Sequence, residues 1–152
     1  MRNLDQIDRK ILRLIQVRAD MSLDELAAQV ALSRNACWRR IKQMEEAGVI
    51  RGRVTLLEPE AVGLGLSVFV MIRTSSHEKN WLEKFKKTVQ SMPEIVGAHR
   101  MSGELDYVLR VRVADMKSYD RFYQQLIAKV SIADISASFV MDDIKDTTVL
   151  PV

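Results

Sequence analysis

The spacing of apolar residues changes along this chain of 152 residues. Before Gly48, apolar side chains recur at the spacing of amphipathic helices. After Gly65, several stretches alternate apolar and polar residues, which is typical of half-buried strands. This order predicts an α+β protein with a helical domain over residues 1–52, an extended connector over residues 53–64 and a second domain over residues 65–152.

Three helices are predicted in the N-terminal domain, each with a recognisable start. Asp5 is a candidate N-cap for the first helix, and Ser22 begins the Ser-x-x-Glu spacing of a capping box for the second. Ser33 can cap a third helix, which ends before Gly48. Cys37 falls on the apolar stripe of this third helix, so we expect a core residue there. The order of helix, tight turn and helix predicts a helix-turn-helix of the winged-helix-like kind.

Positive charge is concentrated in the N-terminal part, although the net charge of the chain is only +3. Residues 1–57 contain 11 Lys/Arg and 7 Asp/Glu, a net charge of +4, whereas residues 58–152 contain 12 and 13, a net charge of −1. Binding to a polyanion depends on such local clusters. The third helix and its cap carry the residues predicted to bind DNA: Ser33, Arg34, Asn35, Trp38, Arg39, Arg40 and Lys42.

The exposed face of the third helix can enter a major groove. Asn35, Trp38 and Arg39 are assigned to base edges, because Asn and Arg can make paired hydrogen bonds to adenine and guanine. The remaining arginines and Lys42 are assigned to phosphates. The alternative is an ordinary solvated helix face on which Trp38 covers a neighbouring apolar patch. The three-helix unit, the tight turn and the local charge together favour DNA binding.

Strands and helices follow one another in the second domain in the order βαββαβ. The predicted strands cover residues 66–73, 95–101, 107–113 and 132–141, and the predicted helices cover residues 80–91 and 116–129. This order builds a ferredoxin-like four-stranded antiparallel sheet with both helices on one face. Because the other face is also apolar, we predict that the protein dimerises through this domain.

Several separate segments resemble the Lrp/AsnC (feast/famine) family of bacterial transcription regulators. The segments are Leu4–Leu12, Leu32-Ser33, Arg39-Arg40-Ile41, Gly48-Val49-Ile50, Ser102–Leu109, Asp115-Met116 and Tyr119. The resemblance implies a DNA-binding regulator whose second domain senses an amino acid. It also implies homodimers that assemble into octamers or other rings, with the small effector held between neighbouring dimers.

The resemblance implies that the effector site includes Met101, Ser102, Gly103, Glu104, Leu105, Asp106, Met116, Ser136 and Ser138. In that site Asp106 suits an ammonium group, and the amides of the turn suit a carboxylate. The alternative is that residues 102–106 only join two strands, with Gly103 supplying a positive φ. Two residues depart from the family pattern: Ala31 replaces a glycine and Arg53 replaces an aromatic residue.

Other classes of protein find less support. With one cysteine and two scattered histidines, we expect no metal, no cofactor and no intramolecular disulfide. No apolar run approaches a membrane span and the N-terminus lacks a secretory pattern, so we expect a cytoplasmic protein with no membrane partner. Two alternatives to the effector-controlled regulator stay open. One is an architectural DNA-binding protein without small-molecule control, and the other is an enzyme resembling sirohaem decarboxylases, which would use His99 and Arg100.

Overall fold

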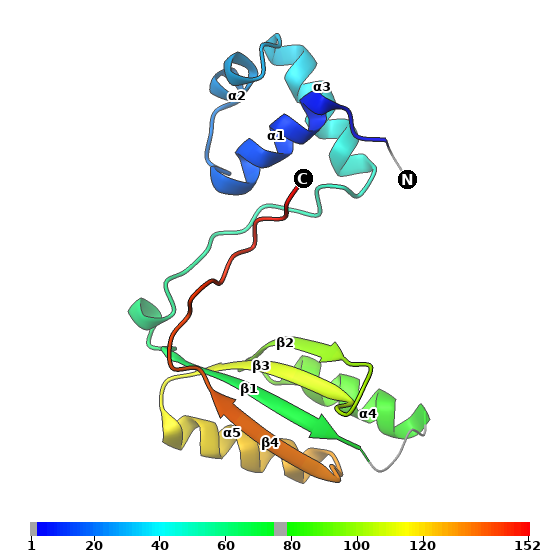
Figure 1. Cartoon of the computed structure of the whole chain (residues 1–152), viewed down its shortest axis with the longest axis vertical. Coiled ribbons are helices and arrows are strands. Elements are labelled where there is room, and N and C mark those ends of the chain that lie inside the picture. Colours follow the sequence, from blue (N-terminus) through cyan, green and yellow to red (C-terminus); the bar gives the residue numbers. More distant parts are fainter. Residues whose placement is uncertain (1–2, 75–78) are drawn as a thin grey trace. The chain divides into compact units, whose positions relative to one another are not determined.

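A computed structural model describes residues 3–74 and 79–152 as two compact units. One unit comprises the chain up to Leu56 together with Lys145–Val152, and the other comprises Leu57–Ile144. The last eight residues, which the sequence assigned to the second domain, therefore group with the N-terminal unit. The chain passes from one unit to the other twice (Figure 1).

The N-terminal unit contains the three predicted helices, α1 (Gln6–Val17), α2 (Leu23–Gln29) and α3 (Arg34–Glu46). Each begins after its predicted cap, Asp5, Ser22 or Ser33. In all three, the cap side chain accepts a hydrogen bond from the backbone N–H three residues later. These bonds satisfy amides that a helix start would otherwise leave without a partner.

The core of this unit fixes the orientation of α3. Cys37 and Met44 are fully buried and Ile41 is 8% exposed, so α3 packs through the predicted stripe. These side chains lie among Ile11 of α1 and Leu26 of α2. Burial raises the pKa of the Cys37 thiol, which keeps this cysteine protonated and unreactive.

Gly48 ends α3 as predicted. Its φ is 70°, and its N–H donates to the carbonyl of Glu45, while the N–H of Val49 donates to the carbonyl of Met44. These two bonds form a Schellman motif, which closes the helix and turns the chain into the connector.

The turn between α2 and α3 contains a strained residue. Ala31 has a φ of 55°, in the left-handed region that favours glycine. A Cβ in this region costs about 1–2 kcal/mol. The turn thus keeps the left-handed geometry although alanine replaces the glycine of the family pattern, and the strain is stored there.

We expect Ala31→Gly to raise the free energy of unfolding of the N-terminal unit by about 1 kcal/mol, because relief of strain exceeds the added entropy of glycine in the unfolded chain. Hydrogen exchange of the α2 and α3 amides in the full chain measures this change. The matched variant is Gly48→Ala, where a new Cβ meets no atom within 4 Å but has an unfavourable φ. It should lower the same free energy by about 1 kcal/mol. Equal protection in Ala31→Gly and the parent protein would contradict the strain.

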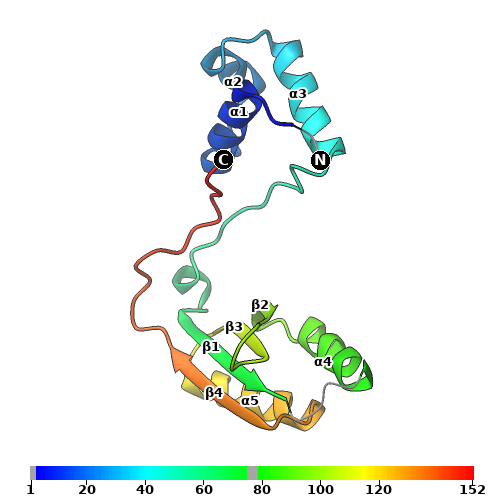
Figure 2. The same cartoon turned by 45° about the vertical axis from the view of Figure 1, so that its right-hand side comes forward.

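The last residues of the sequence complete the N-terminal unit. The Gln16 side chain and the backbone of Leu150 form two hydrogen bonds, of 2.7 and 3.2 Å, and Arg13 Nε donates to the carbonyl of Val152 at 2.5 Å. The Val152 side chain packs against the helical core. Figure 2 shows this segment, coloured red, reaching α1.

The second unit is a sheet covered by helices. Its elements are the 3-10 turn η1 (Glu60–Val62), β1 (Leu66–Arg73), α4 (Lys79–Ser91), β2 (Ile95–Arg100), β3 (Tyr107–Val113), α5 (Met116–Lys129) and β4 (Asp134–Phe139). The strands lie in the order β2-β3-β1-β4, and all neighbours are antiparallel. The predicted α+β fold class and the βαββαβ order are confirmed.

Alternation along the strands separates the two faces of the sheet. Val68, Val70 and Ile72 of β1 are fully buried and pack with Phe85 of α4 and Phe122 of α5. Both helices therefore cover the same face. The intervening residues form the opposite, helix-free face.

The helix-free face is partly apolar. Its centre contains Phe69, 40% exposed, with half-buried Met71 and Val108 opposite each other in register. Ser136 and Ser138 of β4 pair with Met71 and Phe69, so they lie on this face. Apolar side chains at the centre of a sheet face favour coverage by a partner.

Candidate nucleic-acid interface and ligand-binding turn

The outward side of α3 carries most of the residues predicted to contact DNA. Arg34, Asn35, Trp38, Arg39 and Lys42 are exposed. They stand away from the buried stripe because residues on one helix repeat at about 100°. The Ser33 side chain accepts a hydrogen bond from the N–H of Ala36, so it acts first as the helix cap.

Arg40 differs from its predicted role as a phosphate contact. Its guanidinium donates to Asp5 at 2.6 Å and to Asp8 at 2.8 Å, and its side chain is 26% exposed. Asp8 is 2% exposed. Burying a carboxylate is costly unless a cation and hydrogen bonds accompany it. The guanidinium is thus committed to fastening α3 to α1.

The capping box of α1 forms the anchor for Arg40. Asp5 accepts from the N–H of Asp8, and Asp8 accepts in return from the N–H of Asp5 at 3.4 Å. The bond from the N–H of Asp8, followed by the bond from Arg40, lowers the pKa of Asp5. The bond to Asp5 likewise raises the pKa of Arg40. The same two carboxylates therefore start one helix and hold the next.

The other cations near α3 have weaker partners. Arg34 lies 3.7 Å from Asp24, and Lys42 lies 3.8 Å from Glu45, all between well-exposed or half-exposed side chains. Exposed pairs of this kind contribute about 0–1 kcal/mol, so they can be exchanged for phosphate contacts. Within the described residues, Arg39 forms no ion pair. Arg39 and Asn35 are consequently the side chains most available to bases.

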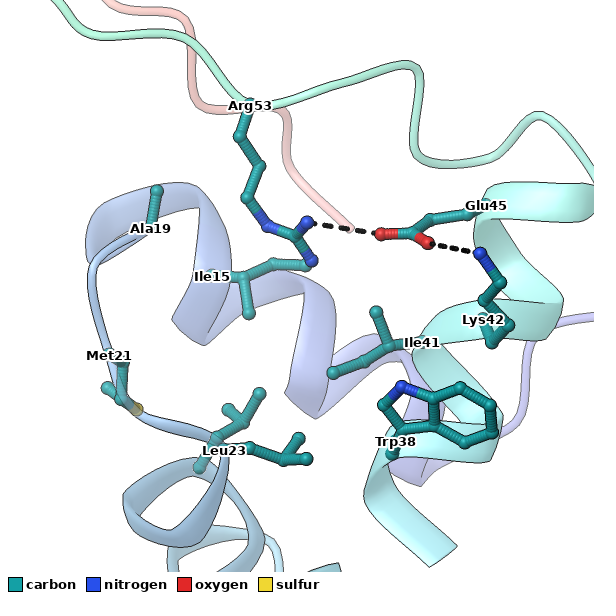
Figure 3. Close-up of a pocket in the computed structure, with 10 residues that line it drawn as sticks. Ile15, Ala19, Met21, Leu23, Trp38, Ile41, Lys42, Glu45 and Arg53 are labelled. Carbon is teal, nitrogen blue, oxygen red and sulfur yellow. Dashed lines mark ion pairs between the residues drawn. The ribbon is translucent and has the colours of Figure 1, made fainter. Parts of the chain in front are cut away.

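Trp38 borders a groove on the N-terminal unit. The groove has a volume of about 430 Å³, and its apolar wall includes Ile15, Met21, Leu23 and Ile41 (Figure 3). Trp38 is nevertheless 56% exposed. One edge of the indole thus covers apolar side chains, as the alternative interpretation expected, while the rest stays accessible from the α3 surface.

The turn between β2 and β3 contains the predicted effector residues 101–106. Gly103 has a φ of 124°, so the turn requires glycine at this position. Asp106 is only half-buried, but its carboxylate accepts from the N–H of Thr74 at 2.8 Å. Glu104 lies 3.8 Å from Arg73. The turn is therefore tied to the end of β1, and one oxygen of Asp106 is used in that tie.

Met116 is not brought to this turn within one chain. It begins α5 directly after β3, whereas the turn precedes β3. The seven residues of β3 span roughly 20 Å. Ser136 and Ser138 lie on the helix-free face, Ser136 nearer the turn. The nine predicted effector residues thus occupy three places on one chain.

Three contacts escaped the sequence-based prediction. Asp8 could be placed in a helix start, but its partnership with Arg40 depends on how two helices pack. The bonds from Arg13 and Gln16 to the last residues join parts of the chain separated by more than 130 positions. No local pattern indicates them.

The described residues contain no group of three or more His, Cys, Asp or Glu that could hold a metal ion. None of the helices in the described ranges is long and apolar enough to cross a membrane.

A helix-turn-helix with a basic exposed helix, joined to a sheet domain with a glycine-containing turn, defines the class of DNA-binding proteins with a ligand-binding domain. Comparison with known families agrees. Residues 4–51 match the winged helix-turn-helix DNA-binding model, and residues 67–150 match the Lrp/AsnC ligand-binding domain. The chain belongs to the Lrp/AsnC family of transcription regulators.

Named relatives cover nearly the whole chain. The DNA-binding transcriptional activator DecR of Escherichia coli K12 is 48% identical over 150 residues, which cover 98% of this chain and 99% of DecR. The glutamate uptake regulatory protein of Zymomonas mobilis is 45% identical over 150 residues, which cover 99% of this chain and 92% of the relative.

Solved structures have the same fold. An AsnC family transcriptional regulator from Agrobacterium tumefaciens is 51% identical with a TM-score of 0.94, covering 97% of this chain and 96% of the other. A transcriptional regulator from Neisseria meningitidis in complex with L-Met is 37% identical with a TM-score of 0.93, covering 98% and 97%. The protein is a transcription regulator and not an enzyme, so the sirohaem-decarboxylase interpretation is set aside.

Proposed function

We propose that this regulator reads duplex DNA with α3 and adjusts its binding to the supply of an amino acid. The observation that carries the proposal is the orientation of α3: its apolar side is docked on α1 and α2, and Asn35 and Arg39 project outward. In a major groove these two side chains meet base edges, while Arg34 and Lys42 meet phosphates. Trp38 contributes its exposed edge.

An amino acid is the ligand class that the second unit supports best. The Neisseria relative was solved with L-Met, and the Zymomonas relative is named for glutamate uptake. The turn at residues 101–106 offers backbone amides for a carboxylate and the remaining oxygen of Asp106 for an ammonium group. Because Met116 lies beyond the other end of β3, a site that uses all nine predicted residues draws them from more than one chain.

Assembly follows from the helix-free face. Two copies that pair these faces cover Phe69, Met71 and Val108, and a two-fold dimer presents two α3 helices to a palindromic site. We propose homodimers that assemble further into octamers or another ring, with the ligand between dimers. A regulator that binds the bacterial chromosome acts in the cytoplasm.

Calorimetry of the full chain against the twenty amino acids tests the ligand. At least one should release heat and change the sedimentation coefficient or the DNA affinity, because a ligand between subunits biases the oligomer. Asp106→Asn keeps an oxygen for the N–H of Thr74 but removes the charge, so it should weaken binding about tenfold or more. Asp134→Asn, an exposed carboxylate at the start of β4, is the control and should bind normally.

Failure of all twenty amino acids, with DNA binding intact, would leave an architectural DNA-binding protein. Equal weakening by Asp106→Asn and Asp134→Asn would remove Asp106 from the ligand site.

A further inference from the structure

Glu45 of α3 lies between two cations. One carboxylate oxygen is 3.1 Å from Nη1 of Arg53, and the other is 3.8 Å from Nζ of Lys42 (Figure 3). The Glu45 side chain is 30% exposed, and those of Lys42 and Arg53 are 50% and 49% exposed. Arg53 belongs to the connector, so this ion pair joins the connector to the recognition helix.

Glu45 needs a cation for a reason set by the helix itself. It stands in the last turn of α3, where the helix dipole presents its negative end, and Glu46 follows it. No basic residue of α3 lies in that turn. Compensation must therefore come from Lys42, one turn earlier, or from Arg53 beyond the helix.

The two cations differ in their other uses. Lys42 stands on the exposed side of α3, one helical turn after Trp38, where its ammonium can reach a DNA phosphate. Pairing with Glu45 competes with that contact. Arg53 is closer to Glu45 and reaches it over the groove that Trp38 borders.

We propose that Arg53 is a positioning residue that occupies Glu45 and so releases Lys42 to the DNA backbone. The inference rests on the proposed role of α3 in DNA binding. Without Arg53, Glu45 retains Lys42, and the recognition helix loses one phosphate contact. Arg53 thus acts on DNA through Glu45, from the position at which this chain departs from the aromatic residue of the family pattern.

The salt dependence of DNA binding by the full chain tests this step, because the slope of log affinity against log salt counts neutralised phosphates. Arg53→Ala should make the slope less negative by about 0.9 for each α3 that contacts the DNA. Glu45→Gln alone should keep the slope. In Glu45→Gln, the further change Arg53→Ala should have no effect on the slope, because nothing then holds Lys42 back.

The control is Arg51→Ala, which removes a charge from the same connector and should change the slope equally in the parent protein and in the Glu45→Gln variant. Far-UV dichroism confirms that each variant is folded. If Arg53→Ala reduces the slope as much in Glu45→Gln as in the parent protein, then Arg53 itself contacts phosphate and the proposal is overturned. An unchanged slope in Arg53→Ala alone overturns it too. Absence of any duplex binding by the parent protein would instead refute the proposed function.

Discussion

Arg40→Met lowers the free energy of unfolding of the N-terminal unit by about 3 kcal/mol, since it leaves the Asp8 carboxylate, 2% exposed, without its guanidinium. Methionine preserves the length and apolar stem of the side chain, so the loss reports the charge. Hydrogen exchange of the α1 and α3 amides in the full chain measures the effect unit by unit.

A double variant separates the ion pair from packing around it. Arg40→Met with Asp8→Leu should recover much of the lost stability, because removing both buried charges is far less costly than removing one. Arg39→Met, its exposed neighbour, should change stability by less than about 0.5 kcal/mol. Normal stability of Arg40→Met combined with weak DNA binding would return Arg40 to the phosphate contacts first predicted for it.

Arg39→Ala should lower affinity for the preferred DNA site by roughly 5- to 150-fold for each α3 in a groove, which corresponds to about 1–3 kcal/mol for a paired contact with guanine. Its exposed side chain, without an ion pair among the described residues, makes Arg39 the arginine most available to a base. Binding to randomised duplexes, followed by sequencing of the bound fraction, identifies the preferred site. Titration of that site then measures the loss.

The comparison between sequences decides the role of Arg39. The preferred site should lose far more affinity than an unrelated duplex, and discrimination at one base pair should relax. Lys42→Ala is the matched variant: it should weaken all duplexes alike and reduce the salt slope. An Arg39→Ala protein that loses affinity equally on every duplex would place Arg39 on the backbone.

Local chemistry made much of the fold predictable from the sequence. Asp5, Ser22 and Ser33 cap helices because their short side chains reach nearby amides, and Gly48 ends α3 because it tolerates a positive φ. The alternating burial of β1 follows from the two-residue period of a strand. Each of these features depends on residues a few positions apart.

Features that depend on packing between distant segments could not be predicted. The helical wheel placed Arg40 beside the basic face, but whether it meets a phosphate or Asp8 depends on the approach of α1. Likewise, Arg53 was expected to add charge beside DNA, and only the fold brings it to Glu45. The effector residues remain predictions, because one chain separates Met116 from the turn at residues 101–106.

The docking of residues 145–152 on α1 makes the N-terminal unit discontinuous in sequence. During synthesis its helices leave the ribosome first, yet Val152 reaches their core only after the whole sheet unit has been made. The nascent DNA-binding unit is therefore incomplete until translation passes residue 152. An isolated fragment that stops at Leu56 lacks this final layer and should exchange its α1 amides faster than the full chain.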